Sequence, residues 1–338
     1  MLNIERNNDR HFDELLELLR GKNVYIQTHN FPDPDAIATA YGLQSLLRHY
    51  GIPSKICYVG KIDRLNTRKM IDLLDIEIYS KEELGDEMTE DDPIICVDSQ
   101  KAEGNLFDLI GDEIACIDHH PSTKQVDYFY KDLREVGSCA SIITEYYMNE
   151  EIPIDRKTAT ALVYGMQMDT SGFTRGVTDA DIAAFGYLYG LADPKILGRL
   201  EQNQMEFQDL KAYGAAIENI QLYDRAGFAH IPFPCQDALI AITCDFILSI
   251  EEIDIAVVYS KRDNGYKFSV RCEDYITEVD CGAIIASTLT PLGGSGGGHA
   301  FMAGGFLPID KVEALGNDPD EVLIERFMDA ISRTYRKE

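Results

Sequence analysis

The feature that most constrains the fold is an alternation, in the first half of the chain, between short apolar segments and amphipathic ones. The apolar segments are typical of strands buried on both faces, which occur in parallel sheets covered by helices. The amphipathic segments repeat with a helical period. We therefore expect an α/β domain with helices on both faces of a parallel sheet. The expected strands are residues 23–28, 54–59, 93–97 and 113–117, and the expected helices are residues 35–50, 67–74 and 105–110.

The second half of the sequence indicates a linker and a smaller α/β domain. Helical patterns cover residues 138–149, 155–168 and 179–191, and residues 204–222 are typical of one long helix. We expect a domain over residues 1–192, a helical linker over 193–224 and a second domain over 225–338, with the active site in the cleft between the domains. In the second domain we expect strands at residues 228–231, 238–243, 255–259 and 266–270 and helices at residues 281–288 and 319–333.

Charge and hydropathy exclude several classes of protein. Lysine and arginine number 31 against 58 acidic residues, a formal net charge of −27, which repels long polyanions and argues against duplex nucleic acid as a partner. No apolar run approaches the roughly 18–20 residues that cross a bilayer, and the N-terminus is too polar for a signal peptide. The expected protein is soluble and cytoplasmic, without a membrane partner.

Acidic and histidine side chains follow three of the expected strands. Any single one has an ordinary explanation as a helix cap or a turn residue. Parallel strands place their carboxyl ends at one edge of a sheet, where ligands bind, and so many carboxylates in one place repel each other unless cations neutralise them. Metal binding is therefore favoured. The residues are His29, Asp33 and Asp35 after the first strand, Asp98 after the third, and Asp118, His119 and His120 after the fourth.

The donor types indicate which metal would bind. Carboxylates with two or three imidazoles and no thiolate suit Mn²⁺, with Mg²⁺, Fe²⁺ or Co²⁺ as substitutes, and the eight cysteines contain no C-x-x-C pair, which disfavours structural zinc. Two ions about 3.5–4 Å apart can activate a water for attack at phosphorus. Asp169 ends another apolar helical pattern, and taken alone it is explained as a polar helix end.

A glycine-rich segment in the second half is the other candidate for ligand binding. Residues 293–298 read Gly-Gly-Ser-Gly-Gly-Gly and precede His299. Glycines let backbone N–H groups approach an anion closely, and the alternative is a flexible loop. Neither a P-loop nor a Rossmann glycine pattern is present.

Together these residues resemble the DHH phosphoesterase superfamily, which carries the triplet found here as Asp118-His119-His120. The Gly296-Gly297-Gly298-His299 segment is similar to that of the branch with a DHH-associated C-terminal domain. The resemblance covers nearly the whole chain in the same order.

The resemblance implies a role for each matching residue. His29 and Asp33 would hold one Mn²⁺ ion, and Asp98 would bridge the two. The second ion would be held by Asp35, His119 and Asp169.

The resemblance also implies which residues act on the substrate. His120 would face the scissile phosphate, and Asp118 would orient the loop by hydrogen bonding. Arg271 and the Gly296–His299 segment would contact the substrate's phosphate. Two departures weaken the substrate assignment: family segments often read G-G-G-H-K and R-S, whereas Ala300 follows His299 and Cys272 follows Arg271 here.

The predicted function is hydrolysis of phosphate esters in short nucleotides by a water that two metal ions activate. The substrate would be a dinucleotide or nanoRNA, cut from one end to nucleoside monophosphates, or 3′-phosphoadenosine 5′-phosphate. Alternatives are a cyclic or linear dinucleotide phosphodiesterase, and an inorganic pyrophosphatase or exopolyphosphatase. A nucleotide-binding sensor without turnover ranks below these, because all six expected ligand positions hold Asp or His. A homodimer is compatible with the sequence.

Overall fold

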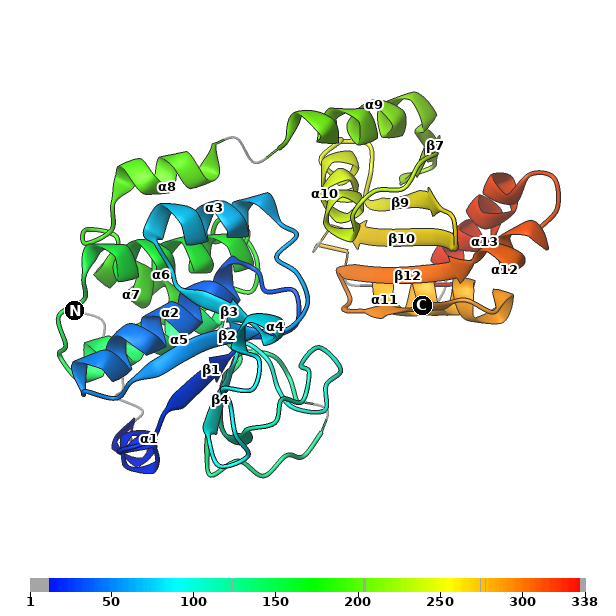
Figure 1. The fold of residues 1–338 in the computed structure, drawn as a ribbon. Helices are drawn as coiled ribbons and strands as arrows, with labels where there is room; N and C mark the ends of the chain where they lie inside the picture. Colours follow the sequence, from blue (N-terminus) through cyan, green and yellow to red (C-terminus); the bar gives the residue numbers. More distant parts are fainter. Residues whose placement is uncertain (1–11, 123, 203–204, 274, 277, 335–338) are drawn as a thin grey trace. The chain divides into compact units, whose positions relative to one another are not determined.

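The apolar segments of the first half form a parallel sheet, as expected. The computed structural model describes residues 12–122, 124–202, 205–273, 275–276 and 278–334. Within these residues the sheet has six strands in the order β3-β2-β1-β4-β5-β6, all paired in parallel (Figure 1). The strands are β1 (Val24–Gln27), β2 (Ser54–Tyr58), β3 (Ile78–Ser80), β4 (Pro93–Val97), β5 (Asp112–Asp118) and β6 (Tyr130–Leu133).

Both faces of this sheet are buried, which explains why its central strands are apolar throughout. Ile26, Ile95 and Ile117 point into a large core formed with the helices, whereas Tyr25 and Cys96 point into a smaller core on the opposite face. The smaller core is closed by the short helix α4 and by irregular segments. The helices of this region are α1 (Phe12–Leu19), α2 (Pro34–His49), α3 (Leu65–Leu74), α4 (Lys81–Leu84), α5 (Cys139–Asn149), α6 (Arg156–Asp169), α7 (Asp179–Leu188) and α8 (Pro194–Glu201).

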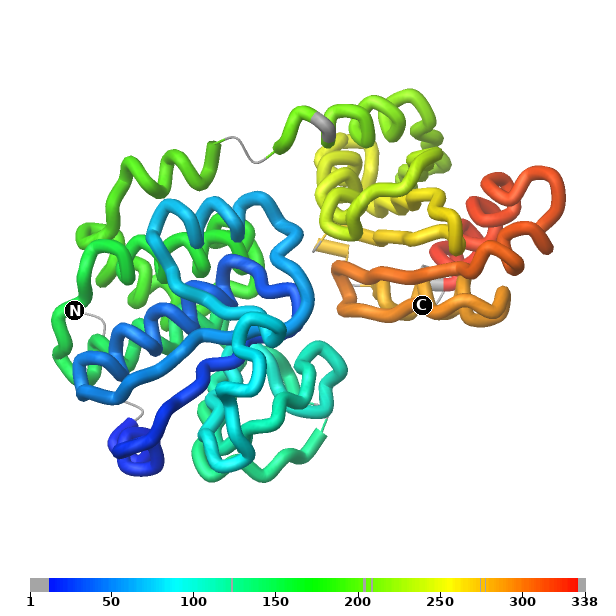
Figure 2. Tube along the Cα trace, viewed as in Figure 1, coloured from blue at the N-terminus to red at the C-terminus, as the bar shows by residue number. Residues whose placement is uncertain are grey.

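The chain divides into two compact units, residues 1–204 and 205–338. Figure 2 follows the chain through the first unit from blue to green and through the second from green to red. The expected linker 193–224 is shared between them, because α8 belongs to the first unit and α9 to the second. None of the described helices combines the length and apolar character needed to cross a bilayer.

The second unit contains a mixed sheet in the order β11-β12-β10-β9-β8-β7. Only β8 and β9 pair in parallel among its described strands. Its strands are β7 (Gln221–Tyr223), β8 (Ala226–Ile231), β9 (Ile255–Arg262), β10 (Gly265–Cys272), β11 (Ser295–Gly298) and β12 (Met302–Pro308). Its helices are α9 (Leu210–Asn219), α10 (Asp237–Leu248), α11 (Cys281–Leu289), α12 (Ile309–Glu313) and α13 (Pro319–Thr334), with 3-10 turns η1 (Phe207–Asp209) and η2 (Thr290–Leu292).

The single long helix expected over residues 204–222 is wrong. Gln204 lies outside the described residues, and the described part contains η1, then α9, then the strand β7. Helix α9 buries Ala212 and Ala216, four residues apart. The residues after Asn219 pair with β8 as an edge strand instead of continuing the helix.

The strand expected over residues 238–243 is also wrong, because this segment lies within α10. Its apolar run fits either element by composition. The buried residues Ile240, Cys244 and Ile247 are spaced four and three apart, which is the helical period.

The short helix expected over residues 105–110 does not form. The backbone of this segment bonds to the end of β1 instead: Gln27 Nε2 donates to the Phe107 carbonyl at 2.7 Å, and Phe107 N–H donates to Asn30 Oδ1 at 3.1 Å. The Asn30 N–H donates to the Asn105 carbonyl at 2.7 Å. These long-range bonds take the place of helical ones.

The contact between α2 and α6 places Asp35 and allows almost no extra volume. A Cβ on Gly165 in α6 would lie 2.6 Å from Ala38 Cβ and 3.2 Å from Asp35 Cα. We expect Gly165→Ala to separate the two helices and to lower the free energy of unfolding by about 1–3 kcal/mol, because overpacking strains a close-packed core. Chemical denaturation measures this.

Gly186→Ala is the matched control. Gly186 is exposed in α7 and nothing lies within 4 Å of a Cβ placed there, so alanine should stabilise by about 0.5–1 kcal/mol through its helix propensity. Equal stability changes in the two variants would contradict the packing account.

Candidate active site

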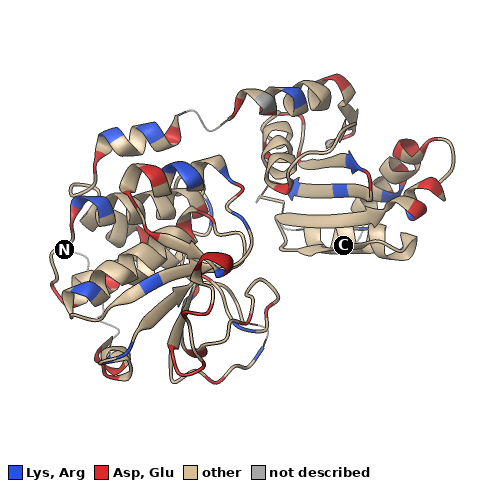
Figure 3. Cartoon of the chain, viewed as in Figure 1, with Lys and Arg blue, Asp and Glu red and all other residues tan. Residues whose placement is uncertain are grey.

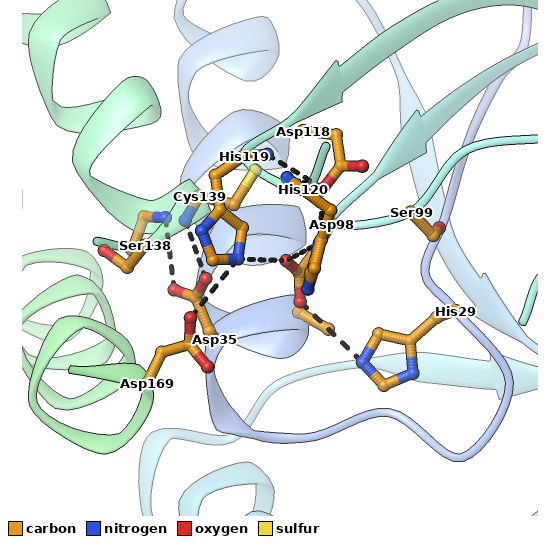
Figure 4. A network of polar contacts seen from close by, with 12 residues as sticks. His29, Asp35, Asp98, Ser99, Asp118, His119, His120, Ser138, Cys139 and Asp169 are labelled. Carbon is orange, nitrogen blue, oxygen red and sulfur yellow. Dashed lines mark hydrogen bonds and ion pairs between the residues drawn. The ribbon is translucent and has the colours of Figure 1, made fainter. Parts of the chain in front are cut away.

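The three strands that end in acidic or histidine residues are neighbours in the sheet. Strand β1 lies between β2 and β4, and β4 lies beside β5. The loops that follow β1, β4 and β5 therefore leave the same edge, and the side chains after them gather there (Figure 4). In that view Asp98 lies between His119 on one side and His29 on the other. The prediction of convergence at the strand ends agrees with this geometry.

Helix α2 begins inside this cluster, and its first turn positions two carboxylates. Asp33 is the N-cap residue, and its Oδ1 accepts from the backbone N–H groups of Asp35 and Ala36 at 3.0 and 3.2 Å. Asp35 is buried, and its two oxygens accept from Cys139 and Ala140 N–H at 2.7 and 3.1 Å. Asp35 thus sits at the N-terminus of α5, where the helix dipole favours an anion.

The three histidines are held in the same way, through Nδ1. His29 Nδ1 lies 2.8 Å from the Asn30 carbonyl, and His119 Nδ1 lies 2.9 Å from the Val136 carbonyl. Because a carbonyl only accepts, each Nδ1 must carry the hydrogen. His120 Nδ1 lies 2.8 Å from Asp118 Oδ1. Each neutral ring therefore presents the lone pair of Nε2, which is the arrangement of metal-binding histidines.

Asp98 is the carboxylate shared by the two sides of the cluster. Its Oδ1 lies 3.3 Å from His119 Nε2, and its Oδ2 lies 3.7 Å from His29 Nε2. His119 Nε2 is also 3.2 Å from Asp169 Oδ2 at the end of α6. Asp98 has a φ of 55°, a left-handed conformation that costs free energy in a residue other than glycine.

Unpartnered buried atoms show that these residues fit a cation. Asp98 Oδ1 and His119 Nε2 are buried and have no hydrogen-bond partner among the described residues, although most buried polar atoms in proteins have one. Ligand atoms within 4.8 Å of each other occur in three groups: His29, Asp33 and Asp98; Asp35, His119 and Asp169; and Asp98, Asp118, His119 and His120. The donors and their spacing thus suit divalent ions on both sides of Asp98.

The pKa values in the cluster reflect its excess of carboxylates over cationic groups. Burial by itself would lower the pKa of His29, but Asp33 and Asp98 outweigh burial and raise it to about 9. For His119, burial is likewise outweighed, chiefly by Asp98, and the pKa is raised. Burial, with the nearby carboxylates, raises the pKa of Asp35 and raises that of Asp169 to about 6. Both the imidazoles and two of the carboxyl groups therefore tend to hold protons where the carboxylates crowd together.

Asp118 supports the loop after β5. Its Oδ1 accepts from the N–H groups of His119 and His120 at 2.8 and 3.3 Å as well as from His120 Nδ1. Burial would raise the pKa of Asp118, but the hydrogen bonds from His120 and Gln100 outweigh it and lower the pKa. The carboxylate therefore stays ionised and holds the His120 ring.

Gln100 is a site residue that the sequence reasoning missed. Its Nε2 donates to Asp118 Oδ2 at 2.9 Å and to the His120 carbonyl at 3.0 Å. A buried glutamine two residues after Asp98 carries no motif of its own. Its position just beyond a strand that ends at the cluster is the signal that could have found it.

The remaining predicted residues lie in the second unit. Arg271 is at the end of β10, opposite Met302 of β12, and its guanidinium contacts Asp245 at 2.9 Å and Ser269 at 3.1 Å. His299 is exposed, and its N–H donates to the Met302 carbonyl at 2.8 Å. Arg271 and His299 therefore lie on the two sides of Met302.

The glycine-rich segment mostly forms the edge strand β11, so the alternative of a flexible loop is wrong for residues 295–298. Gly296, Gly297 and Gly298 pair with Gly305, Gly304 and Ala303 of β12. A Cβ on Gly298, whose φ is 151°, would lie 2.4 Å from the Met302 carbonyl oxygen. This close approach explains why glycine is needed there.

The comparisons with known proteins assign the class. Residues 23–166 match the DHH family N-terminal domain, and residues 232–325 match the DHHA1 domain. The two domains occur in this order and together span most of the chain. The chain therefore belongs to the DHH superfamily of phosphoesterases with a C-terminal DHHA1 domain, as its motifs predicted.

Individual relatives show how far the similarity extends. The uncharacterized protein MJ1633 of Methanocaldococcus jannaschii is 30% identical over 87% of this chain and 60% of its own length. The cyclic-di-AMP phosphodiesterase GdpP of Bacillus subtilis is 27% identical over 72% of this chain and 40% of its own length. The chain thus spans 60% of the length of the first relative and 40% of the length of the second.

A solved structure supports the fold. An exopolyphosphatase-related protein from Bacteroides fragilis superposes with a TM-score of 0.74 at 21% identity, covering 96% of this chain and 95% of the other. At that identity the likeness concerns the fold.

The raised pKa values predict that metal uptake releases protons. At pH 7 the metal-free site holds a proton on His29, whose pKa is about 9, and a bound ion must displace it from the Nε2 lone pair. Calorimetric titration with Mn²⁺ in two buffers of different ionisation enthalpy should show net proton release, and the affinity should weaken as the pH falls from 9 to 6.

A His29→Gln variant should release fewer protons in the same titration, because glutamine has no proton to lose. Binding without proton release at pH 7, or an affinity that does not change with pH, would contradict the assigned charge states.

Proposed function

We propose that this chain is a manganese-dependent phosphoesterase that hydrolyses phosphate esters of short nucleotides. The observation that carries the proposal is the convergence of three imidazoles, each held through Nδ1, on the carboxylates around Asp98. Imidazole nitrogens and carboxylate oxygens without thiolates suit Mn²⁺, with Mg²⁺, Co²⁺ or Fe²⁺ as substitutes.

In this proposal the cluster holds two ions that share Asp98. His29 and Asp33 would bind one ion, on the side of Asp98 Oδ2. Asp35, His119 and Asp169, the remaining donors, would bind the other ion. When bound, the ions would supply an activated water and neutralise charge at phosphorus.

His120 would bind the phosphate of the substrate. Its side chain is 40% exposed, whereas that of His119 is 11% exposed, so its free Nε2 edge is the more accessible of the two. Burial would lower the pKa of His120, but Asp118 and Asp98 raise it. A proton kept at Nε2 lets this ring donate a hydrogen bond to a phosphoryl oxygen as negative charge develops there.

The second unit would supply further phosphate contacts. Arg271 offers a guanidinium, the group best suited to a phosphate's oxygens, and His299 is exposed on the other side of Met302. To bind a phosphate, Arg271 would exchange its ion pair with Asp245 for one with the ligand. The Asp245 side chain is 59% exposed and would then be solvated by water. We assign these two residues and the Gly296–Gly298 strand to substrate binding.

The overall charge supports a short substrate. Figure 3 shows Asp and Glu residues, coloured red on the ribbon, in both units, in keeping with the formal charge of −27. Such a field disfavours a long polyanion, which gains from many basic contacts, more than a dinucleotide that needs few. We therefore favour dinucleotides, nanoRNA or 3′-phosphoadenosine 5′-phosphate.

A dinucleotide phosphodiesterase acting on cyclic or linear substrates is the second candidate. The specific observation in its favour is the 27% identity to the cyclic-di-AMP phosphodiesterase GdpP over 72% of this chain.

Asp98→Asn tests the shared ligand. The amide keeps the shape of the carboxylate but removes its charge and half of its acceptor capacity, so we expect less than the wild-type metal content and a fall in kcat of about 100-fold or more. Metal analysis and an assay with a dinucleotide and Mn²⁺ measure both. Asp72→Asn, on the exposed face of α3, removes the same charge outside the cluster and should leave both unchanged.

A substrate panel tests the assignment of substrate length. We expect hydrolysis of a dinucleotide with Mn²⁺ to be faster than that of a long single-stranded RNA, because the long chain is repelled by the protein's field. Faster cleavage of the long RNA would overturn the proposal. Hydrolysis of pyrophosphate but of no nucleotide would show that the substrate is inorganic.

A further inference from the structure

An exposed aromatic ring lies within the loop that carries the first two candidate metal ligands. Phe31 is two residues from His29 and two from Asp33, a span of at most about 7 Å of chain on either side. It is 58% exposed. The hydrophobic clusters formed by the described residues do not include it, so packing of the core gives no reason for phenylalanine here.

The backbone at Phe31 makes its identity more unusual. Its φ is 59°, in the left-handed region where glycine and asparagine are favoured and a bulky side chain costs roughly 1–2 kcal/mol. The Phe31 N–H donates to the Val59 carbonyl at 3.2 Å, and the preceding Asn30 N–H is held by Asn105. The conformation is thus maintained by bonds to two other segments.

The neighbouring loop after β2 receives the ring. A Cβ on Gly60 would lie 3.0–3.2 Å from three carbons of the Phe31 ring, so the ring packs against the Gly60 backbone. With this support on one side, the ring stays largely exposed without being free to collapse onto the core. It is an exposed apolar surface two residues from the candidate ligands His29 and Asp33.

A cationic group lies near the same loop. Arg64 Nη1 is 3.9 Å from Asp33 Oδ2, and the Arg64 side chain is 49% exposed. Arg68 donates to the carbonyls of Ile62 and Asp63 at 3.2 and 2.7 Å and so holds the segment that carries Arg64. An aromatic ring on one segment and a guanidinium on another therefore lie near the candidate ligands His29 and Asp33.

We propose that Phe31 is a specificity residue that stacks on a nucleobase of the substrate. The inference rests on the proposed function and deepens it, because it distinguishes nucleotides from inorganic phosphates. A nucleotide bound by its phosphate at the cluster carries its base one sugar away, and every base has an apolar face that an aromatic ring can cover. Pyrophosphate and polyphosphate have no such surface, and a ring at Phe31 would do nothing for them.

The test compares an intact dinucleotide with the same molecule lacking its bases. Phe31→Asn removes the ring while keeping a residue that tolerates positive φ, and Phe31→Tyr keeps a ring. We expect kcat/KM for the intact dinucleotide to fall about 5- to 100-fold in Phe31→Asn, mainly through KM, relative to the change for the abasic molecule. Phe31→Tyr should restore most of the difference.

The outcomes separate this inference from the function on which it rests. An equal fall for both molecules, or no fall for either, would overturn the stacking role, because a ring that only shapes the ligand loop affects both alike. Failure of the wild-type protein to hydrolyse the dinucleotide would count against the proposed function instead.

If the wild-type protein does not hydrolyse the dinucleotide, ligand binding can still test the stacking role of Phe31. Calorimetry with Mn²⁺ should show that Phe31→Asn weakens binding of adenosine monophosphate more than that of ribose 5-phosphate. Equal weakening of the two ligands would overturn the inference. The metal content of each variant is measured to show that His29 and Asp33 are intact.

Discussion

The interaction on which the site depends is the repulsion among the carboxylates gathered around Asp98. Asp33 has ligand atoms close to those of Asp98, and the charge of Asp98 helps to raise the pKa values of Asp35 and Asp169. Two features of the fold hold them together: the N-terminus of α5 binds Asp35, and the first turn of α2 binds Asp33. Backbone amides thus offset part of the charge, and cations are left to offset the rest.

The imidazoles face these carboxylates, but a neutral imidazole does not neutralise a carboxylate's charge. Because His29 and His119 direct Nδ1 to carbonyl oxygens, their Nε2 atoms face carboxylates and must carry either a proton or a metal ion. The carboxylates that face Nε2 therefore raise the pKa values of His29 and His119. His120 differs because its Nδ1 is held by Asp118, which leaves its more exposed edge for a ligand.

Much of the first unit could be predicted from the sequence, because strands buried on both faces are apolar throughout and are easily recognised. Position at the strand ends then predicted that His29, Asp98 and His119 would lie close together, as they do in the structure. The prediction failed where composition does not determine the element: the apolar run around Ile240 fits a strand or a helix, and only its packing shows the helix. The segment around Phe107 does not form the expected helix, because its backbone makes long-range hydrogen bonds with Gln27 and Asn30.

The glycine-rich segment and Gln100 illustrate two further limits. Consecutive glycines suggest a flexible loop, but pairing along β12 makes them an edge strand, which depends on a partner that comes later in the chain. Gln100 acts through a hydrogen bond to Asp118, 18 residues away, and no local pattern reveals such a contact.

The most direct measurement of the central claim is electron paramagnetic resonance of the protein loaded with Mn²⁺. If two ions share Asp98, adding Mn²⁺ to saturation should bind two ions per chain and give the spectrum of a magnetically coupled pair. The spectrum of isolated Mn²⁺ ions at saturation, or binding of one ion per chain, would contradict the account.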